Sequence, residues 1–195
     1  AGFILANGAL SGAGEEYKIR RKLIENNLVE AILVLPRNLF YTTDISVTLW
    51  ILNKNKKAHS QNIGEQQRNY RNREKEILFM DLRQIGEPFE KKFTQFSETQ
   101  VKDIAKTYHA WQQEKSDFIN VPEYCYSASF DEVAKKDFSL VPSKYIEFVN
   151  RDENIDFDEK MKSLQKEFTN LLKAEVAAKN DLLTVFKDLG YEIKL

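Results

Sequence analysis

The strongest constraint on the fold is an apolar run from Leu28 to Leu35 that ends at Pro36 and is soon followed by a second run from Ile45 to Leu52. A run with almost no polar interruption predicts a strand covered on both faces. The link between the runs is too short for a helical crossover, so the two strands should be antiparallel. Their connecting loop presents Phe40, Tyr41, Thr42 and Thr43. We therefore expect a strand–loop–strand unit whose tip can bind something flat, although simple aromatic packing at a strand end fits the composition equally well.

An α/β sheet is predicted upstream of this unit. Phe3 to Ala6 is a short apolar strand, and Glu15 to Asn26 is a helix that opens with acidic residues and stops at an Asn-Asn pair. Strand, helix and strand in this order predict a right-handed parallel crossover. The intervening loop, Gly8 to Gly14, matches neither a dinucleotide fingerprint nor a Walker motif, so we expect a flexible connector.

Downstream, the pattern predicts one more strand and then helices. Residues 54–75 are polar and rich in lysine and arginine, which indicates a loop or linker, whereas Glu76–Asp81 is a strand. Pro88 is taken as a boundary, which divides the chain into an α/β part (1–87) and a helical assembly region (88–195). Capping boxes are predicted at Ser97/Gln100 and Ser129/Glu132. A long helix over about 156–189 carries apolar residues at alternating spacings of four and three: Phe157, Met161, Leu164, Phe168, Leu171, Leu182, Val185 and Leu189.

Composition limits the class of protein without naming a partner. The 195 residues are 42% hydrophobic and 30% charged with a net charge of −1, as expected for a soluble globular chain without bulk basicity. A local basic patch would still suffice for phosphate contacts. The single cysteine, Cys125, favours a reducing cytoplasm, and no apolar run approaches the roughly 20 residues that span a bilayer. The chain opens inside a strand, so we expect it to be a fragment of a longer protein.

Few residues fit metal binding or nucleophilic catalysis. His59 lies in the polar segment and His109 on a helix, without further ligands at metal-binding spacing. Cys125 has no histidine partner and is expected to be a small buried side chain. Glu90-Lys91-Lys92 loosely resembles an element of nucleases, but a chain this rich in Glu and Lys yields such triplets by chance. We therefore expect no catalytic residue and no metal site in this chain.

Several short segments, in order, resemble the modification subunits of type I restriction systems, which are N6-adenine DNA methyltransferases that use S-adenosylmethionine. The Leu35–Leu52 block is the most specific of them, and the resemblance spans nearly the whole chain. Two family signatures are absent: a glycine-rich cofactor loop, and Asn-Pro-Pro followed by an aromatic residue. Both precede the matching region in the family, so the resemblance implies a C-terminal fragment. The matching segments are Ala6–Leu10, Ile19–Leu23, Leu35–Leu52, Phe79–Asp81 and Phe130–Tyr145.

The resemblance implies a fold. It would be the C-terminal portion of a Rossmann-like, seven-stranded methyltransferase sheet, with its last strands forming a reversed hairpin, followed by a mostly helical region. S-adenosylmethionine would bind the full-length protein, and none is expected on this chain alone.

The resemblance also implies site residues. Phe40 is the candidate for stacking on the target base, with Tyr41 as the fallback, and Pro36 and Thr43 would support the loop. Arg37 is a candidate for phosphate contacts. Arg20 and Arg21 are further candidates, although a solvated helix surface or salt bridging is the favoured role for these two.

Partners follow from the same resemblance: DNA, the specificity subunit and the restriction subunit, in a bacterial or archaeal cytoplasm. The long helix, about 50 Å at 1.5 Å per residue, would pack either on the specificity subunit or on the chain's own core. The alternative function is a non-catalytic assembly module that binds the specificity subunit through these helices. An open sheet edge could also drive self-association.

Overall fold

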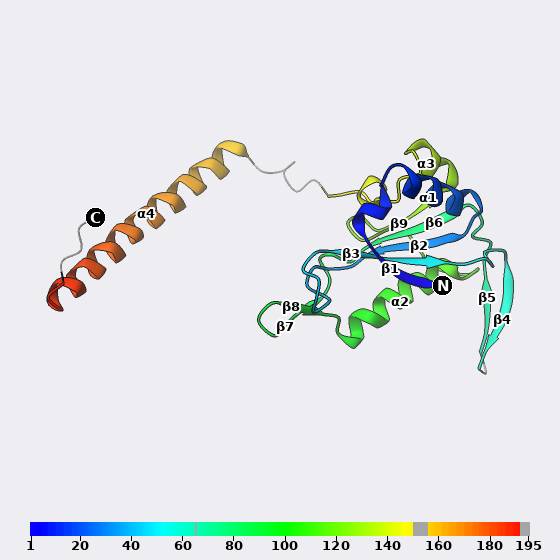
Figure 1. The fold of residues 1–195 in the computed structure, drawn as a ribbon, viewed down its shortest axis with the longest axis horizontal. Coiled ribbons are helices and arrows are strands. Elements are labelled where there is room, and N and C mark those ends of the chain that lie inside the picture. The colour runs from blue at the N-terminus through cyan, green and yellow to red at the C-terminus, as the bar shows by residue number, and fades with distance from the viewer. Residues whose placement is uncertain (65, 150–155, 192–195) are drawn as a thin grey trace. The chain divides into compact units, whose positions relative to one another are not determined.

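A computed structural model describes residues 1–64, 66–149 and 156–191 (Figure 1). The chain forms two compact units, Ala1–Val149 and Asn150–Leu195. This division lies well beyond the boundary at residue 87 that the sequence predicted, because residues 88–149 complete the α/β unit.

The first unit is built on a five-stranded mixed sheet. Its strand order is β1–β3–β2–β6–β9, with β3 antiparallel to both of its neighbours, β2 parallel to β6, and β9 antiparallel to β6. The predicted crossover from β1 to β2 is present, and β3 lies between those two parallel strands. The expected antiparallel relation between β2 and β3 is confirmed. The strands are β1 (Gly2–Ala6), β2 (Val29–Val34), β3 (Val47–Leu52), β6 (Glu76–Asp81) and β9 (Cys125–Ser129).

Helices cover both faces of the sheet. One face packs against α1 (Glu15–Glu25), α3 (Phe130–Lys135) and two separate short 3₁₀ helices, η1 (Asn7–Leu10) and η2 (Pro142–Lys144). The helix α2 (Glu98–Gln112) covers the other face (Figure 1). Successive residues of β2 point to opposite faces. Ile32 therefore joins the core under α1 and α3, and Leu33 joins the core under α2. This explains the unbroken apolar pattern of β2. Both predicted capping boxes are confirmed, at Ser97 and Ser129.

Residues 54–75 are not the predicted loop, because most of them form a β-hairpin, β4 (His59–Ile63) and β5 (Gln66–Tyr70). The hairpin extends from the sheet at the end opposite to the β2–β3 loop (Figure 1). Its pairing is supported by polar contacts, since Ser60 Oγ donates to Asn69 Oδ1 at 2.8 Å and the His59 ring stacks on Tyr70 at 4.7 Å. Exposed polar side chains on both faces give no apolar alternation, which is why the sequence pattern did not reveal these strands.

Two charged side chains at the base of this hairpin, Lys56 and Arg73, are buried, which the sequence does not predict. Arg73 is 1% exposed, and its Nε donates to Oε1 of the fully buried Glu30 at 3.0 Å. Gln112 Nε2 donates to the same oxygen at 3.0 Å. Lys56 is 2% exposed, and its Nζ donates to the carbonyls of Val29 and Glu76 at 2.8 and 2.6 Å. These contacts tie both stems of the hairpin to the sheet.

Two further differences concern the region between β3 and β9. The strand predicted from Ile45 begins at Val47, and Ile45 is 54% exposed in the loop. The predicted helical region after Pro88 instead begins with a small hairpin, β7 (Glu87–Phe89) and β8 (Phe93–Gln95), and later supplies β9 to the sheet. Each of these strands has at most five residues and a mixed polar pattern, too short to show a period.

In the second unit, the described residues form one long helix, α4 (Phe157–Asp188). Asp156 is its N-cap, since the Asp156 carboxylate accepts hydrogen bonds from the backbone N–H groups of Asp158 and Glu159. Gly190 has φ = +80°, and Tyr191 N–H donates to the Phe186 carbonyl, which closes the C-terminal end of the helix. Every apolar residue of the four–three pattern is exposed on α4. Nowhere in the described residues is a helix long and apolar enough to cross a membrane.

Candidate functional site

Three loops leave the sheet at the carboxyl ends of its parallel strands. Ala6 pairs with Val47, and Val34 pairs with both Thr48 and Asp81, so β1, β2 and β6 end at the same edge. The segments that follow are residues 7–14, 36–46 and 82–96. In open α/β sheets, ligands bind outside the carboxyl ends of the strands. This edge is therefore the candidate functional site, and the β4–β5 hairpin lies at the opposite end (Figure 1).

The loop between β2 and β3 is held by its own backbone. Thr43 N–H donates to the Phe40 carbonyl at 3.1 Å, and these two residues form an antiparallel bridge. Arg37 Nε donates to the Asp44 carbonyl at 3.1 Å, while Pro36 is buried at the strand end. Asn38 adopts φ = +58°, a conformation that asparagine tolerates better than most residues. The chain between β2 and β3 is thus a closed, defined turn.

The two aromatic residues at the tip of this loop differ in exposure. Phe40 is half-buried and packs on the core under α2. Tyr41 is 72% exposed, and its ring meets Phe93 edge-on at 4.8 Å between ring centroids. A cavity of about 360 Å³ lies beside Tyr41, and it is lined by Leu39, Tyr41, Phe89, Phe93, Thr94, Gln95 and Phe96. A cavity walled mainly by rings and aliphatic side chains suits a flat ligand.

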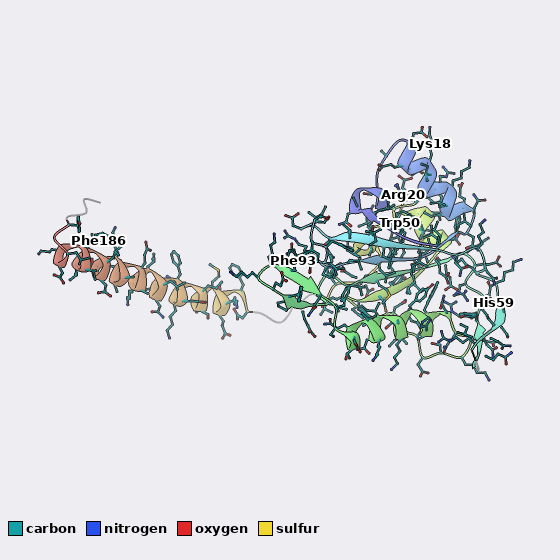
Figure 2. The ribbon with its side chains drawn as sticks, turned by 60° about the horizontal axis from the view of Figure 1, so that its bottom comes forward. Lys18, Arg20, Trp50, His59, Phe93 and Phe186 are labelled. Carbon is teal, nitrogen blue, oxygen red and sulfur yellow. The ribbon has the colours of Figure 1, made fainter. Side chains whose placement is uncertain are left out.

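The three arginines proposed for phosphate contacts lie in three different settings. Arg20 is 3% exposed and donates to the carbonyls of Phe138, Ala9 and Gly12 at 2.9, 3.1 and 2.9 Å. Burial lowers the pKa of its guanidinium. Arg20 therefore ties α1 to the loop after β1, and it is neither a surface phosphate contact nor the solvated or salt-bridged residue that the sequence favoured. Figure 2 shows Arg20 closer to the sheet than Lys18 of the same helix.

Arg21 and Arg37 remain at the surface. Arg21 Nε pairs with Glu25 at 2.7 Å, which matches the salt bridge that the sequence favoured for it. Its guanidinium also lies 5.0 Å from the Phe138 ring centroid. Arg37 lines a second cavity, of about 640 Å³, at the candidate edge. Of the three arginines, Arg37 is the one that lines this cavity.

Residues 83–94, which no sequence motif singles out, also contribute to the candidate site. They form much of the wall of the second cavity, together with Pro36, Arg37, Asn38 and Ser46. The β7–β8 hairpin is joined to the loop by the hydrogen bond from Thr94 N–H to the Asn38 carbonyl, at 2.9 Å. Phe93 marks the hairpin at one end of the sheet, and His59 lies at the other (Figure 2). The only local signal was the Glu90-Lys91-Lys92 triplet, which the sequence alone could not tell from chance.

The remaining candidates are structural. Cys125 is buried and 1% exposed, and burial raises the pKa of its thiol, so the expectation of a small buried side chain is confirmed. His59 Nδ1 lies 2.8 Å from the Lys57 carbonyl, and His109 Nδ1 lies 3.3 Å from Gln112 Oε1. In the part of the chain that the structure describes, no group of three or more potential ligands could hold a metal ion.

Comparison with known families and sequences gives a consistent picture. The family model of N-6 DNA methylases matches residues 1–154. The methylase subunit of the type I restriction enzyme HindI from Haemophilus influenzae is 34% identical over 97% of this chain and 40% of that relative. The MjaIX methylase subunit from Methanocaldococcus jannaschii is 30% identical over 98% of the chain and 32% of that relative. The chain therefore spans between a third and two-fifths of the length of these two relatives.

Solved structures show a similar fold. The methyltransferase subunit of a type I restriction-modification system from Streptococcus thermophilus superposes with a TM-score of 0.59 at 21% identity, over 75% of this chain and 26% of that one. The M protein of the type I restriction enzyme EcoKI superposes with a TM-score of 0.54 at 14% identity, over 90% of this chain and 40% of that one. At these identities the likeness concerns the fold alone.

Proposed function

The chain belongs to the N-6 DNA methylase family, and on that basis we propose that it works as part of the modification subunit of a type I restriction-modification system. The reaction of that subunit would be transfer of a methyl group from S-adenosylmethionine to N6 of adenine in DNA. DNA, a specificity subunit and a restriction subunit would be its partners in a bacterial or archaeal cytoplasm. One structural observation supports this role most directly: the aromatic loop of residues 36–46 lies at the carboxyl edge of the sheet.

The strand arrangement supports a position for this chain within a methyltransferase sheet. Two parallel strands, β1 and β2, flank the reversed strand β3. We infer that they are the last three strands of the seven-stranded sheet that the family resemblance implies. The loop between β2 and β3 would then face the substrate. The strands that carry the cofactor motifs in the family would belong to a preceding part of the subunit.

We propose that the residues of this chain do not themselves hold S-adenosylmethionine. Neither the glycine-rich cofactor loop nor Asn-Pro-Pro-aromatic occurs in the 195 residues. The glycine-bearing loop that is present, residues 7–14, is held from within, because Arg20 binds the carbonyls of Ala9 and Gly12 and Leu10 is buried. We therefore assign no step of methyl transfer to a cofactor held by this chain and propose that the cofactor binds elsewhere in the subunit.

The role proposed for this chain is to hold the target base. The amino group of adenine is paired inside a duplex, so the nucleotide must be turned out of the stack before it can react. Stacking of the extruded base on an aromatic ring contributes about 1–3 kcal/mol. Phe40 is the proposed stacking residue, and the more exposed Tyr41 is the second candidate. Pro36 and Thr43 would hold the loop in position.

Removing the ring of residue 40 should slow methylation. In the modification subunit that carries this chain, assembled with its specificity subunit, Phe40→Leu is expected to lower kcat/KM for methyl transfer about 5- to 150-fold, since about 1–3 kcal/mol of stacking is lost. Phe40→Tyr keeps the ring and should keep activity near that of the wild type. Transfer of a radioactive methyl group to DNA measures both.

Tyr41→Leu gives the matched comparison at the neighbouring position. A large loss in Tyr41→Leu with none in Phe40→Leu would move the stacking role to Tyr41. Unchanged methylation in both variants would contradict a base-holding role for the loop. Assembly with the specificity subunit, followed by gel filtration, checks that each variant is folded.

A second candidate function is assembly without catalysis, and the exposed apolar row of α4 favours it. The spacing of four and three over Phe157, Met161, Leu164, Phe168 and Leu171 is that of a helix that packs against another helix. We propose that the helices of the specificity subunit occupy this row. Glu175 and Ala178 interrupt the pattern, so the contact should be strongest over residues 157–171.

A charge placed in this row should weaken assembly. Leu171→Asp is expected to weaken binding of the specificity subunit at least about tenfold, because it places a carboxylate in an apolar helix contact. Asn170→Asp is the matched control, since it adds the same charge one residue away on a different side of α4. Calorimetric titration of the specificity subunit measures both. Equal affinities for the two variants would show that the row is covered by something else.

A further inference from the structure

The cavity of about 640 Å³ at the carboxyl edge of the sheet is lined by cationic side chains from three segments of the chain. Arg37 comes from the β2–β3 loop, Arg83 from the segment after β6, and Lys91 and Lys92 from the turn of the β7–β8 hairpin. Two carboxylates, Glu87 and Glu90, also line it. The lining therefore has an excess of positive charge in a chain whose net charge is −1, and this excess favours an anionic ligand.

The four cations are not equally available to a ligand. Arg83 binds the Asp81 carboxylate through two nitrogens, with Nη2–Oδ2 at 2.6 Å and Nε–Oδ1 at 2.9 Å. Arg37 uses its Nε on the Asp44 carbonyl. Within the described residues, neither Lys91 nor Lys92 has a carboxylate within ion-pair distance, and the Lys92 ammonium lies 5.1 Å from the Phe93 ring centroid. The two exposed lysines are thus the cations most free to bind an anion.

This cationic cavity adjoins the aromatic one. Phe93 and Thr94 line both. Two contacts join the hairpin to the loop: Thr94 N–H donates to the Asn38 carbonyl, and the Phe93 ring packs on Tyr41. Gly86 brings the backbone close to the hairpin: it has φ = +128°, and a Cβ there would lie 2.5 Å from Thr94 Cγ2. A ring-lined cavity fixed beside a cationic one matches the two parts of a nucleotide, its base and its phosphate.

We propose that the β7–β8 hairpin binds the sugar–phosphate backbone of the DNA strand next to the target adenine, with Lys91 and Lys92 contacting phosphates. This inference rests on the proposed function, and it adds the hairpin to the residues that would position the substrate. The phosphate contacts would hold the strand while the loop at Phe40 and Tyr41 takes the base.

Salt dependence distinguishes a phosphate contact from a structural role. In the modification subunit assembled with its specificity subunit, K91A/K92A should weaken binding to a labelled duplex about tenfold. The variant should also reduce the slope of log K against log salt concentration by about 2, because each phosphate contact contributes roughly one to that slope. Fluorescence anisotropy at several salt concentrations measures both. K54A/K57A is the matched control: it removes two positive charges at the opposite edge of the sheet, and it should leave affinity and slope unchanged.

Each other outcome has a defined meaning. An unchanged affinity and slope in K91A/K92A would overturn the proposal, and so would a weaker affinity with an unchanged slope, which indicates only a structural effect. If the lysines instead serve an acidic protein, K91A/K92A should lose binding to polyglutamate while it keeps binding to DNA, and this too overturns the proposal. A wild-type complex that neither binds DNA nor methylates it would contradict the proposed function itself. If the wild-type complex methylates DNA normally, a negative result with K91A/K92A contradicts only the proposal for the hairpin.

Discussion

Replacing Arg73 with methionine is expected to lower the free energy of unfolding of the first unit by about 3–5 kcal/mol, because Glu30 then remains buried without its cation. Glu30 is 0% exposed, and one of its oxygens, Oε2, has no hydrogen-bond partner among the residues that the structure describes. Lys56 cannot replace Arg73 directly, since its ammonium donates to the carbonyls of Val29 and Glu76. Arg73 also donates to the Arg71 carbonyl, so the variant loses several contacts at once.

Urea unfolding of the 195-residue chain, followed by tryptophan fluorescence, measures this loss. Trp50 and Trp111 are 2% and 0% exposed in the first unit, so their emission reports on that unit. Lys18→Met is the control, because the Lys18–Glu15 pair is exposed and its removal should change stability by less than about 0.5 kcal/mol. A loss below about 1 kcal/mol in Arg73→Met would contradict the assignment of a buried, coupled pair.

A second substitution tests the cause of the loss. Glu30→Gln in the Arg73→Met background removes the uncompensated charge while it nearly preserves the side-chain volume. The double variant should therefore be more stable than Arg73→Met alone by at least about 1 kcal/mol. Additive losses would indicate that packing around the Arg73 side chain, and not the buried charge, accounts for the destabilisation.

Much of the sheet could be predicted from the sequence because its central strands are covered on both faces. β2 and β6 carry unbroken apolar runs, since alternate residues such as Ile32 and Leu33 enter different cores. The helix starts were also predictable, because the capping residues Ser97, Ser129 and Asp156 act over only three residues of sequence. Sequence patterns predict these elements because their physical causes act between residues that are close together in the chain.

The β4–β5 hairpin and its buried base could not be predicted in this way. Its strands are polar on both faces, and Lys56 and Arg73 appear in a sequence as surface residues. Arg73 is buried against Glu30, which lies 43 residues before it, and Lys56 is buried against the carbonyls of Val29 and Glu76. A sequence pattern treats each charge by itself, whereas burial of a charge is decided by its partner.

The candidate site was predictable in part. The loop of residues 36–46 follows from two apolar runs and a proline, and the structure places it at the edge where ligands bind. The contact of this loop with the β7–β8 hairpin joins Asn38 to Thr94 and Tyr41 to Phe93 across more than 50 residues of chain. Arg20 was predicted to lie at the surface, because its sequence neighbours include charged residues. Its side chain instead points inward and donates to the carbonyls of Ala9, Gly12 and Phe138.

The buried ammonium of Lys56 should make the stability of the first unit rise with pH. Burial is the main cause that lowers the pKa of Lys56, from its ordinary 10.5 to about 8 in the folded chain, with Arg73 adding to the shift and Glu30 opposing it. Below pH 8 the folded and unfolded chains both hold this proton, so its contribution is constant. Above pH 8 the unfolded chain still binds the proton and the folded chain releases it, and stability therefore rises with pH.

The size of this rise is best measured as a difference between two proteins. Between pH 8 and about 10, the free energy of unfolding of the wild type should rise by about 2–3 kcal/mol relative to Lys56→Met. Other groups titrate in this range, and Cys125 and Tyr108 have pKa values that burial raises. They are present in both proteins, so their effects cancel in the difference. Parallel pH profiles for the two proteins would mean that Lys56 titrates at its ordinary pKa and that the base of the β4–β5 hairpin is open to water.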